Sequence, residues 1–172
     1  KLGDFYSFVR FGCSWWTDYA VEIRVKPKMV KPDSFMQLFV RRDPGNYDGY
    51  YGSLSFENSY YDLAYSSPYR SLEQGTLGSI FSDWVTLRIE VAGSQINYYI
   101  NNIIVGEGRD NRLLQGSASI VVSPGLEVCI DNIRAWMLTG TGSIGQAPQP
   151  ITPSLEIVTD KAATSNGGNR WG

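Results

Sequence analysis

The chain has 172 residues, of which 42% are hydrophobic and 13% aromatic, and its 15 basic and 17 acidic residues give a formal net charge of -2. This balance gives no electrostatic reason to expect nucleic acid or an anionic membrane as a partner, and the longest apolar runs have the length of strands rather than of membrane spans. The absence of histidine from the sequence excludes Ser-His-Asp, Cys-His and His-zinc sites.

The first third of the chain predicts strands. Residues 4–11 have strand composition, and residues 12–17 form a loop that carries two large aromatic side chains. Residues 18–26 alternate most clearly, with apolar side chains on one face and charged side chains on the other. Residues 34–41 are apolar on both faces, as expected of a central strand that is covered above and below.

The middle of the chain continues this pattern. A loop at 43–49, rich in turn formers, leads to tyrosine-rich strands at 50–56 and 59–65. Residues 66–82 are less regular and predict no clear strand. Residues 84–91 and 95–100 alternate in phase on either side of a short turn, which predicts a hairpin.

A second hairpin follows, because Asn101-Asn102 can supply the positive φ angles of a tight two-residue turn before a strand at 103–105. A polar loop then precedes the closing strand at 126–137. The apolar positions of that strand slip by one residue at Asp131-Asn132, which predicts a β-bulge. No amphipathic helical run of useful length appears, so we expect about ten to twelve strands in two packed sheets.

These residues carry a resemblance to a known superfamily. A Trp-initiated strand, a short turn, an Ile-x-x-Tyr-Ile-Asn strand, a small-residue loop and a closing Ile-Asp-Asn-Ile-x-x-Trp strand follow one another in this order. The order, which covers residues 18–137, resembles the concanavalin A-like and laminin-G-like jelly-roll lectin superfamily. The resemblance implies an all-β fold, an antiparallel jelly-roll β-sandwich of two packed sheets. It does not decide function, because that fold serves lectins, hydrolases, adhesion modules and virion components alike.

The composition changes after the closing strand. We expect residues 1–138 to form the sandwich and residues 139–172 to form an extended C-terminal tail, a Gly/Pro/Ser-rich linker with a short strand near 154–160. Leu155, Ile157 and Val158 would hold this tail, by adding a strand either to the edge of its own domain or to a neighbouring copy.

The sequence carries no recognisable catalytic constellation. Retaining glycosidases on this kind of fold place two carboxylates about 5 Å apart on one strand, and no such pattern occurs. The strand carboxylates Glu22, Glu57, Glu90 and Glu127 are isolated, and each is expected on a solvated face. We therefore predict that the protein is not an enzyme.

The aromatic residues are the most suggestive feature, and three interpretations stay open. Half of them belong to the core, or they form a platform for a glycan, or they form a subunit interface. Which of these holds depends on the strand register. The candidates for a ligand-binding platform are Trp15, Trp16, Tyr50, Tyr51, Tyr60, Tyr61, Tyr65 and Tyr98.

The resemblance also suggests a metal site and a disulfide. Asp131, with loop carboxylates such as Asp48 and Asp110, resembles calcium sites of the superfamily, although hydrogen bonding at a bulge explains Asp131 equally simply. Jelly rolls often bring their first and last strands together, so Cys13 and Cys129 are candidates for a disulfide, with two free thiols as the alternative. No cofactor is expected beyond such a structural calcium ion.

Two functions follow from these observations. The first is a non-catalytic recognition module, extracellular or on a cell or virion surface, that binds a glycan or acts in adhesion. The second is a structural subunit of an extracellular filament, sheath or virion coat, assembled through the C-terminal tail as a homo-oligomer. The expected partners are accordingly a glycan or other subunits of the same protein.

Overall fold

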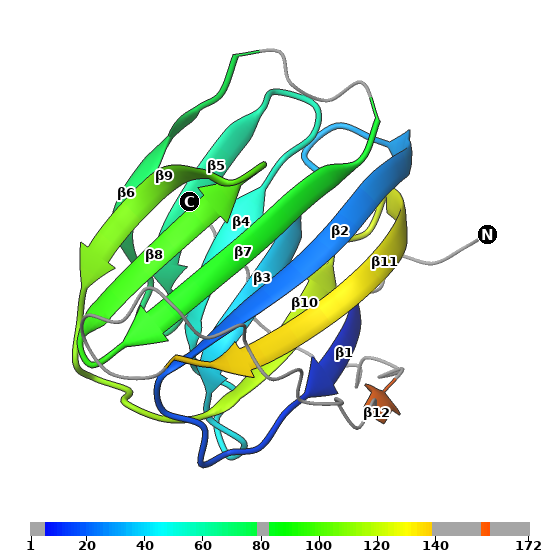
Figure 1. Cartoon of the computed structure of the whole chain (residues 1–172). Helices are drawn as coiled ribbons and strands as arrows, with labels where there is room; N and C mark the ends of the chain where they lie inside the picture. The colour runs from blue at the N-terminus through cyan, green and yellow to red at the C-terminus, as the bar shows by residue number, and fades with distance from the viewer. Residues whose placement is uncertain (1–5, 79–82, 139–155, 159–172) are drawn as a thin grey trace.

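The alternating runs of the sequence become strands of two facing sheets. The structure, a computed structural model, describes residues 6–78, 83–138 and 156–158. In these residues two antiparallel sheets pack face to face, and no α-helix is present (Figure 1). Consequently no helix in this part of the chain is long and apolar enough to cross a membrane. The predicted all-β jelly-roll sandwich is confirmed.

The sheet at the back of Figure 1 has seven strands, in the order β12-β1-β10-β3-β4-β5-β6. Neighbouring strands come from distant parts of the sequence, as when β10 separates β1 from β3. The strands are β1 (Ser7–Phe11), β3 (Met36–Arg42), β4 (Tyr50–Leu54), β5 (Tyr60–Tyr65), β6 (Arg70–Thr76), β10 (Ser117–Val122) and β12 (Glu156–Val158).

The sheet at the front has five strands, in the order β11-β2-β7-β8-β9. Its centre is the predicted hairpin, with β7 paired to β8 on one side and to β2 on the other. The strands are β2 (Tyr19–Val30), β7 (Val85–Ala92), β8 (Gln95–Ile100), β9 (Ile103–Arg109) and β11 (Leu126–Met137).

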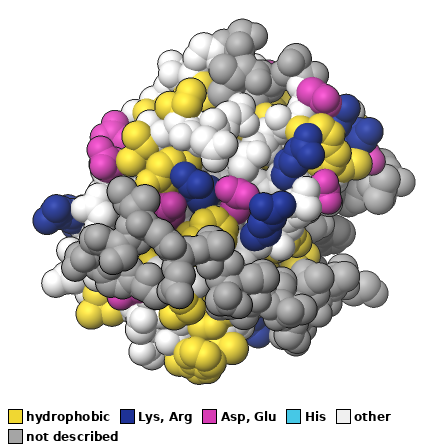
Figure 2. Space-filling model, in the orientation of Figure 1, with side chains coloured by type: hydrophobic (Ala, Val, Ile, Leu, Met, Phe, Trp, Pro, Cys, Tyr) yellow, Lys and Arg dark blue, Asp and Glu magenta, His cyan; other side chains and the backbone are white. Residues whose placement is uncertain are grey.

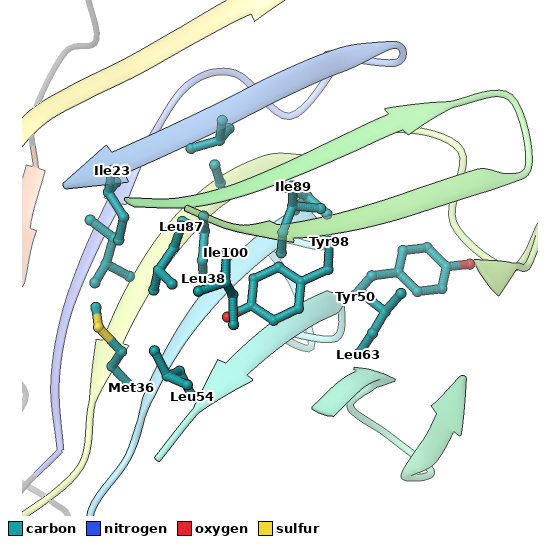
Figure 3. Close-up of a cluster of buried hydrophobic side chains, with 14 of the residues drawn as sticks. Ile23, Met36, Leu38, Tyr50, Leu54, Leu63, Leu87, Ile89, Tyr98 and Ile100 are labelled. Atoms are coloured by element: carbon teal, nitrogen blue, oxygen red, sulfur yellow. The ribbon is translucent and has the colours of Figure 1, made fainter. Parts of the chain in front are cut away.

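The core lies between the sheets, because every second residue of each central strand faces the other sheet. The alternation is complete in β7, where four apolar residues are buried and the residues between them are partly exposed. Figure 3 shows Ile23, Leu87, Ile89, Tyr98 and Ile100 of the five-stranded sheet opposite Met36, Leu38, Tyr50, Leu54 and Leu63 of the other sheet.

One end of the sandwich is closed by a buried arginine. The Arg41 side chain is fully buried, and its guanidinium donates hydrogen bonds to the carbonyls of Thr17 (3.0 Å), Gly93 (2.6 Å) and Leu113 (3.2 Å). It also donates to Asp18 Oδ1 at 3.2 Å. A buried cation is tolerated only with such partners, so Arg41 ties three loops to the end of β3.

The turns and the bulge follow the sequence expectations. Asn101 and Asn102 have φ angles of 50° and 64° in the tight turn between β8 and β9. The pairing of β11 with β2 shifts register between Asp131 and Arg134, and Asn132 has a φ angle of 53°. Both the two-residue turn and the β-bulge are therefore confirmed.

Two strands were not expected from the sequence. β10 lies inside the segment taken as a polar loop, and β6 lies inside the irregular stretch 66–82. The polar-loop interpretation is wrong for residues 117–122, because Ser117 and Ser119 are buried beside apolar residues within a sheet. Serine side chains can hydrogen bond within a sheet, as Ser119 does with Arg42, so they do not mark a loop here.

The tail returns to the sandwich at β12. This strand pairs antiparallel with β1 of its own chain, with Phe8 opposite Val158 and Arg10 opposite Glu156 (Figure 1). It lies within the segment 154–160 expected to form a strand, whereas Leu155 and the predicted linker fall outside the described residues. Association of the tail with a neighbouring copy stays a prediction.

Candidate functional site

The eight aromatic residues proposed as one platform separate onto different faces. Side chains alternate along a strand, so Tyr50 enters the core whereas Tyr51 lies on the outer side of the seven-stranded sheet. The structure corrects the single-platform prediction for this reason. Trp16, Tyr50, Tyr61, Tyr65 and Tyr98 pack in the core, Trp15 is exposed in the loop after β1, and Tyr51 and Tyr60 are on the outer side.

We call the outer side of the seven-stranded sheet the seven-stranded face. Its members are set by the strand register, in which Phe39 lies opposite Tyr51 and Tyr51 lies opposite Ala64. The next row places Ser53 opposite Asp62. The face comprises Phe8, Val121, Ser119, Gln37, Phe39, Tyr51, Ser53, Tyr60, Asp62, Ala64, Ser71 and Gln74.

A buried carboxylate lies at the centre of β5 on this face. Asp62 is only 6% exposed, and its two oxygens accept hydrogen bonds from Ser71 Oγ (2.7 Å) and the Tyr69 hydroxyl (3.1 Å). Among the described residues, no lysine or arginine forms an ion pair with it. A buried carboxylate needs such hydrogen-bond donors, and here neutral hydroxyl groups supply them.

Three tyrosines surround this carboxylate. Burial raises the pKa of the Tyr51, Tyr60 and Tyr69 hydroxyls, and the negative charge of Asp62 raises all three further. The Tyr60 hydroxyl also donates to Gln74 Oε1 at 2.6 Å. At neutral pH the three phenols are therefore protonated, and Tyr69 donates to Asp62 whereas Tyr60 donates to Gln74.

An apolar floor adjoins the carboxylate. The rings of Phe39 and Tyr51 lie 5.1 Å apart between centroids at an interplanar angle of 44°. They form a small cluster with Ala64, Val121 and Phe8, which the sheet separates from the main core. The seven-stranded face thus combines flat apolar rings with convergent polar groups, a combination typical of small-molecule sites.

Sequence reasoning missed the polar half of this arrangement. Asp62, Tyr69, Ser71 and Gln74 were not among the predicted site residues. One signal for Asp62 was present in the sequence: it is the single carboxylate in an otherwise apolar and aromatic strand. Asp62 and Ala64 are two residues apart, so their side chains lie on the same face of the sheet. Ser71 and Gln74 gave no signal, because β6 itself was not expected.

The proposed calcium ligands do not come together. Asp131 is on β11 and Asp110 follows β9, and these are the two edge strands of the five-stranded sheet. Asp48 and Asp110 both lie near Tyr65 and raise the pKa of its hydroxyl, an effect smaller than that of burial. Among the described residues no three potential ligands are grouped for a metal ion, so calcium binding stays a prediction without an assembled site.

Asp110 has a structural role instead. Its carboxylate accepts a hydrogen bond from the Tyr50 hydroxyl (2.8 Å) and lies 3.5 Å from Arg70 Nη1 and 3.6 Å from Arg112 Nε. Burial alone would raise the pKa of Asp110, but these hydrogen bonds and cations, with the Arg112 backbone N–H, outweigh it and hold the pKa below its usual value.

Of the two alternatives for the cysteines, a disulfide or two free thiols, the structure has the free thiols. Cys13 and Cys129 are free and exposed. Cys129 lies in the middle of β11 between Val128 and Ile130, which both pack against the core, so its thiol points away from the sandwich. Cys13 follows β1 of the other sheet.

The opposite surface has a different character. Figure 2 shows basic and acidic side chains mixed over the five-stranded sheet. Arg88 is paired there, with its Nη1 3.8 Å from Glu22 and its Nε 3.2 Å from Glu90, and its guanidinium lies 4.1 Å from the centroid of the Tyr99 ring. The charge of Arg88 is offset by these two glutamates, so this cluster is a weaker candidate for a ligand site.

No protein-family model matches the sequence, and no curated protein matches it. Solved structures do match. A carbohydrate-binding module, CBM66, from Bacillus subtilis is 15% identical with a TM-score of 0.64, over 77% of this chain and 83% of that chain. A galectin from Caenorhabditis elegans is 14% identical with a TM-score of 0.55, over 73% and 88% of the two chains.

The third similar structure is domain 4 of an extracellular GH43 arabinanase from Geobacillus stearothermophilus, in complex with arabinotriose. It is 21% identical with a TM-score of 0.52, over 74% of this chain and 65% of that chain. The protein has the concanavalin A-like, lectin-like jelly-roll fold. Likeness at this level of identity concerns the fold alone, so the function must be argued from the face itself.

Proposed function

We propose that the protein is a non-catalytic glycan-binding module and that the seven-stranded face around Asp62 is its binding surface. The observation that carries the proposal is a buried carboxylate without a cationic partner in the described residues, ringed by protonated phenols beside an apolar floor. A carboxylate accepts hydrogen bonds in several directions, and neighbouring sugar hydroxyls supply donors in this way.

The rest of the face fits a sugar ring. Tyr51 and Phe39 supply apolar rings beneath the site, of which 8% and 6% of the residue surface is open to the C–H side of a pyranose or furanose. Tyr60, Tyr69 and Gln74 lie around the carboxylate with groups that donate or accept hydrogen bonds, and Tyr69 is 54% exposed. The site therefore has both the apolar surface and the convergent polar groups that fix a ligand's orientation.

The similar structures support this proposal by their names. One is a carbohydrate-binding module, one is a galectin, and one is a domain of an extracellular arabinanase solved with arabinotriose. We extend the proposal to location and role on the same ground. The protein acts outside the cell, and it binds a glycan rather than cleaving one.

The test is a glycan array followed by isothermal titration calorimetry with the strongest hit. Asp62→Asn keeps the shape but exchanges acceptor oxygens for an amide, and we expect at least a tenfold loss of affinity, about 1.4 kcal/mol. Tyr51→Ala removes part of the floor and should weaken binding similarly. Asp131→Asn, on the edge of the other sheet, is the matched control and should bind as the parent does.

Two outcomes would overturn the proposal. One is an array without any hit for a protein that is folded by circular dichroism. The other is a hit whose affinity is unchanged by Asp62→Asn and Tyr51→Ala and reduced by changes on the five-stranded sheet.

A further inference from the structure

Next to the residues of the seven-stranded face, at the end of β3, the arginine Arg42 packs on aromatic rings. The guanidinium carbon of Arg42 lies 4.7 Å from the centroid of the Phe39 ring, 5.4 Å from that of Tyr47 and 5.7 Å from that of Phe8. A guanidinium over an aromatic face is attracted by the ring's electrons. The three rings therefore hold this cation in one place on the face.

Two hydrogen bonds fix the orientation of the Arg42 side chain. Nη1 donates to Ser119 Oγ at 2.6 Å and Nε donates to the Tyr47 carbonyl at 3.2 Å. Both partners are neutral, so they orient the guanidinium without neutralising it. The cation is placed as rigidly as a binding group must be.

Arg42 has no acidic partner in the described part of the chain. The carboxylate next to it in sequence, Asp43, accepts hydrogen bonds from the backbone N–H groups of Gly45 (2.7 Å) and Asn46 (3.2 Å) and so turns toward its own loop. Burial lowers the pKa of Arg42, and the neighbouring charge of Arg10 lowers it further. The positive charge of Arg10 therefore lies close enough to Arg42 to act on its guanidinium.

Arg42 and Asp62 lie apart on the same sheet. Arg42 covers Phe39 of β3, and Asp62 is on β5, two strands away. Neighbouring strands are about 4.8 Å apart, so β3 and β5 are separated by roughly 10 Å. Asp62 also lies one row further along the strands, opposite Ser53. Tyr51, on β4, lies between the two groups. The face therefore has an acceptor end, an apolar middle and a donor end, with a length that suits two or three sugar units.

We infer that Arg42 forms an anion subsite of the glycan-binding face and that the ligand is an acidic glycan, whose carboxylate or sulfate meets this guanidinium. The inference rests on the proposed function. Carboxylate and sulfate share the planar or forked oxygen pairs that a guanidinium binds through two N–H groups. The hydroxyl-rich end of the ligand then faces Asp62, which would repel a second acidic group.

The experiment uses matched ligand pairs that differ only in charge. The array carries oligogalacturonates beside their methyl esters, and sulfated oligosaccharides beside their desulfated forms. We expect the charged member of at least one pair to bind five-fold or more tightly, with an advantage that shrinks between 50 and 300 mM salt, conditions over which charge interactions are progressively screened. The best pair is then measured by calorimetry.

Variants separate the two ends of the face. Arg42→Gln should reduce the affinity for the acidic member to that of the neutral member and leave neutral binding unchanged, whereas Asp62→Asn should weaken both members. Arg42→Lys keeps the charge without the fork and should fall between. Arg134→Gln, an exposed position on β11, is the control and should change neither affinity.

The outcomes distinguish this inference from the function on which it rests. Neutral and acidic members that bind equally, or an Arg42→Gln variant that weakens both alike, would overturn the anion subsite and leave glycan binding intact. A folded protein that binds no glycan of either kind would overturn both.

Discussion

The ring of Tyr98 lies directly over Gly52 across the interface between the two sheets. A Cβ atom at Gly52 would lie 2.5 Å from Tyr98 Cε2, closer than real atoms approach. Glycine at this position of β4 is what lets a tyrosine from β8 fill the centre of the core (Figure 3).

Gly52→Ala should therefore destabilise the protein by about 1–3 kcal/mol, because the added methyl group overpacks the core. Urea unfolding followed by tryptophan fluorescence measures the change. Gly78→Ala is the matched control, since nothing lies within 4 Å of a Cβ atom there. Equal stability of the two variants would contradict the close packing of Tyr98.

Arg41→Met should cost about 3–5 kcal/mol, because it leaves the carbonyls of Thr17, Gly93 and Leu113 without their donor in a buried place. Arg134→Met, at an exposed site, should stay within about 0.5 kcal/mol of the parent. Thermal unfolding of both variants at pH 7 compares them. A stable Arg41→Met variant would show that the loops hold together without this cation.

Acid should weaken the protein partly through Asp110. Its pKa is lowered in the folded state, so the stability that its ionised form contributes is complete above the ordinary value of 3.8 and is lost as the pH falls below it. Between pH 7 and pH 3 the parent should lose more stability than Asp110→Asn. Asp131→Asn should lose as much as the parent, and a parallel loss in all three proteins would exclude a role for Asp110.

Alkali should weaken the protein through its buried tyrosines. Burial raises the pKa of Tyr50 from 10.0 to about 12, and it raises that of Tyr19 and Tyr98 still more. A raised folded-state pKa means that stability is complete below pH 10 and is lost as the pH rises above it. Absorbance at 295 nm should show part of the tyrosines ionising only as the chain unfolds. Smooth titration of every tyrosine near pH 10 would contradict this.

The exposed thiols of Cys13 and Cys129 should both react with Ellman's reagent in the native protein, giving two equivalents per chain without reductant. Cys129→Ser should give one. Reaction only after reduction would reveal a disulfide that the structure lacks.

The sequence predicted the strands whose two faces differ. Residues 84–91 alternate because one side of β7 is buried and the other is partly exposed to solvent. The one-residue shift of the apolar pattern at Asp131 corresponds to the β-bulge in β11. β10 was not predicted because five of its six residues are buried, serines included, so polar and apolar positions do not alternate between exposed and buried.

The site was predictable only in part. The tyrosine-rich segment was recognised, but a one-residue change of register moves every side chain to the other face, so the core tyrosines could not be told from Tyr51 and Tyr60. Asp62 accepts a hydrogen bond from Ser71 of β6. Which residues of two strands lie opposite each other cannot be predicted from the sequence of either strand alone.

β12 pairs with β1 at three positions, so the edge of the seven-stranded sheet at β1 is already occupied there. The terminal strand on the other flank of the described sheet is β6, which carries Ser71 and Gln74. A polypeptide that lengthened the sheet from β6 would run alongside the groups that hold Asp62. Growth of the sheet along that edge would therefore place a new strand beside the proposed binding face.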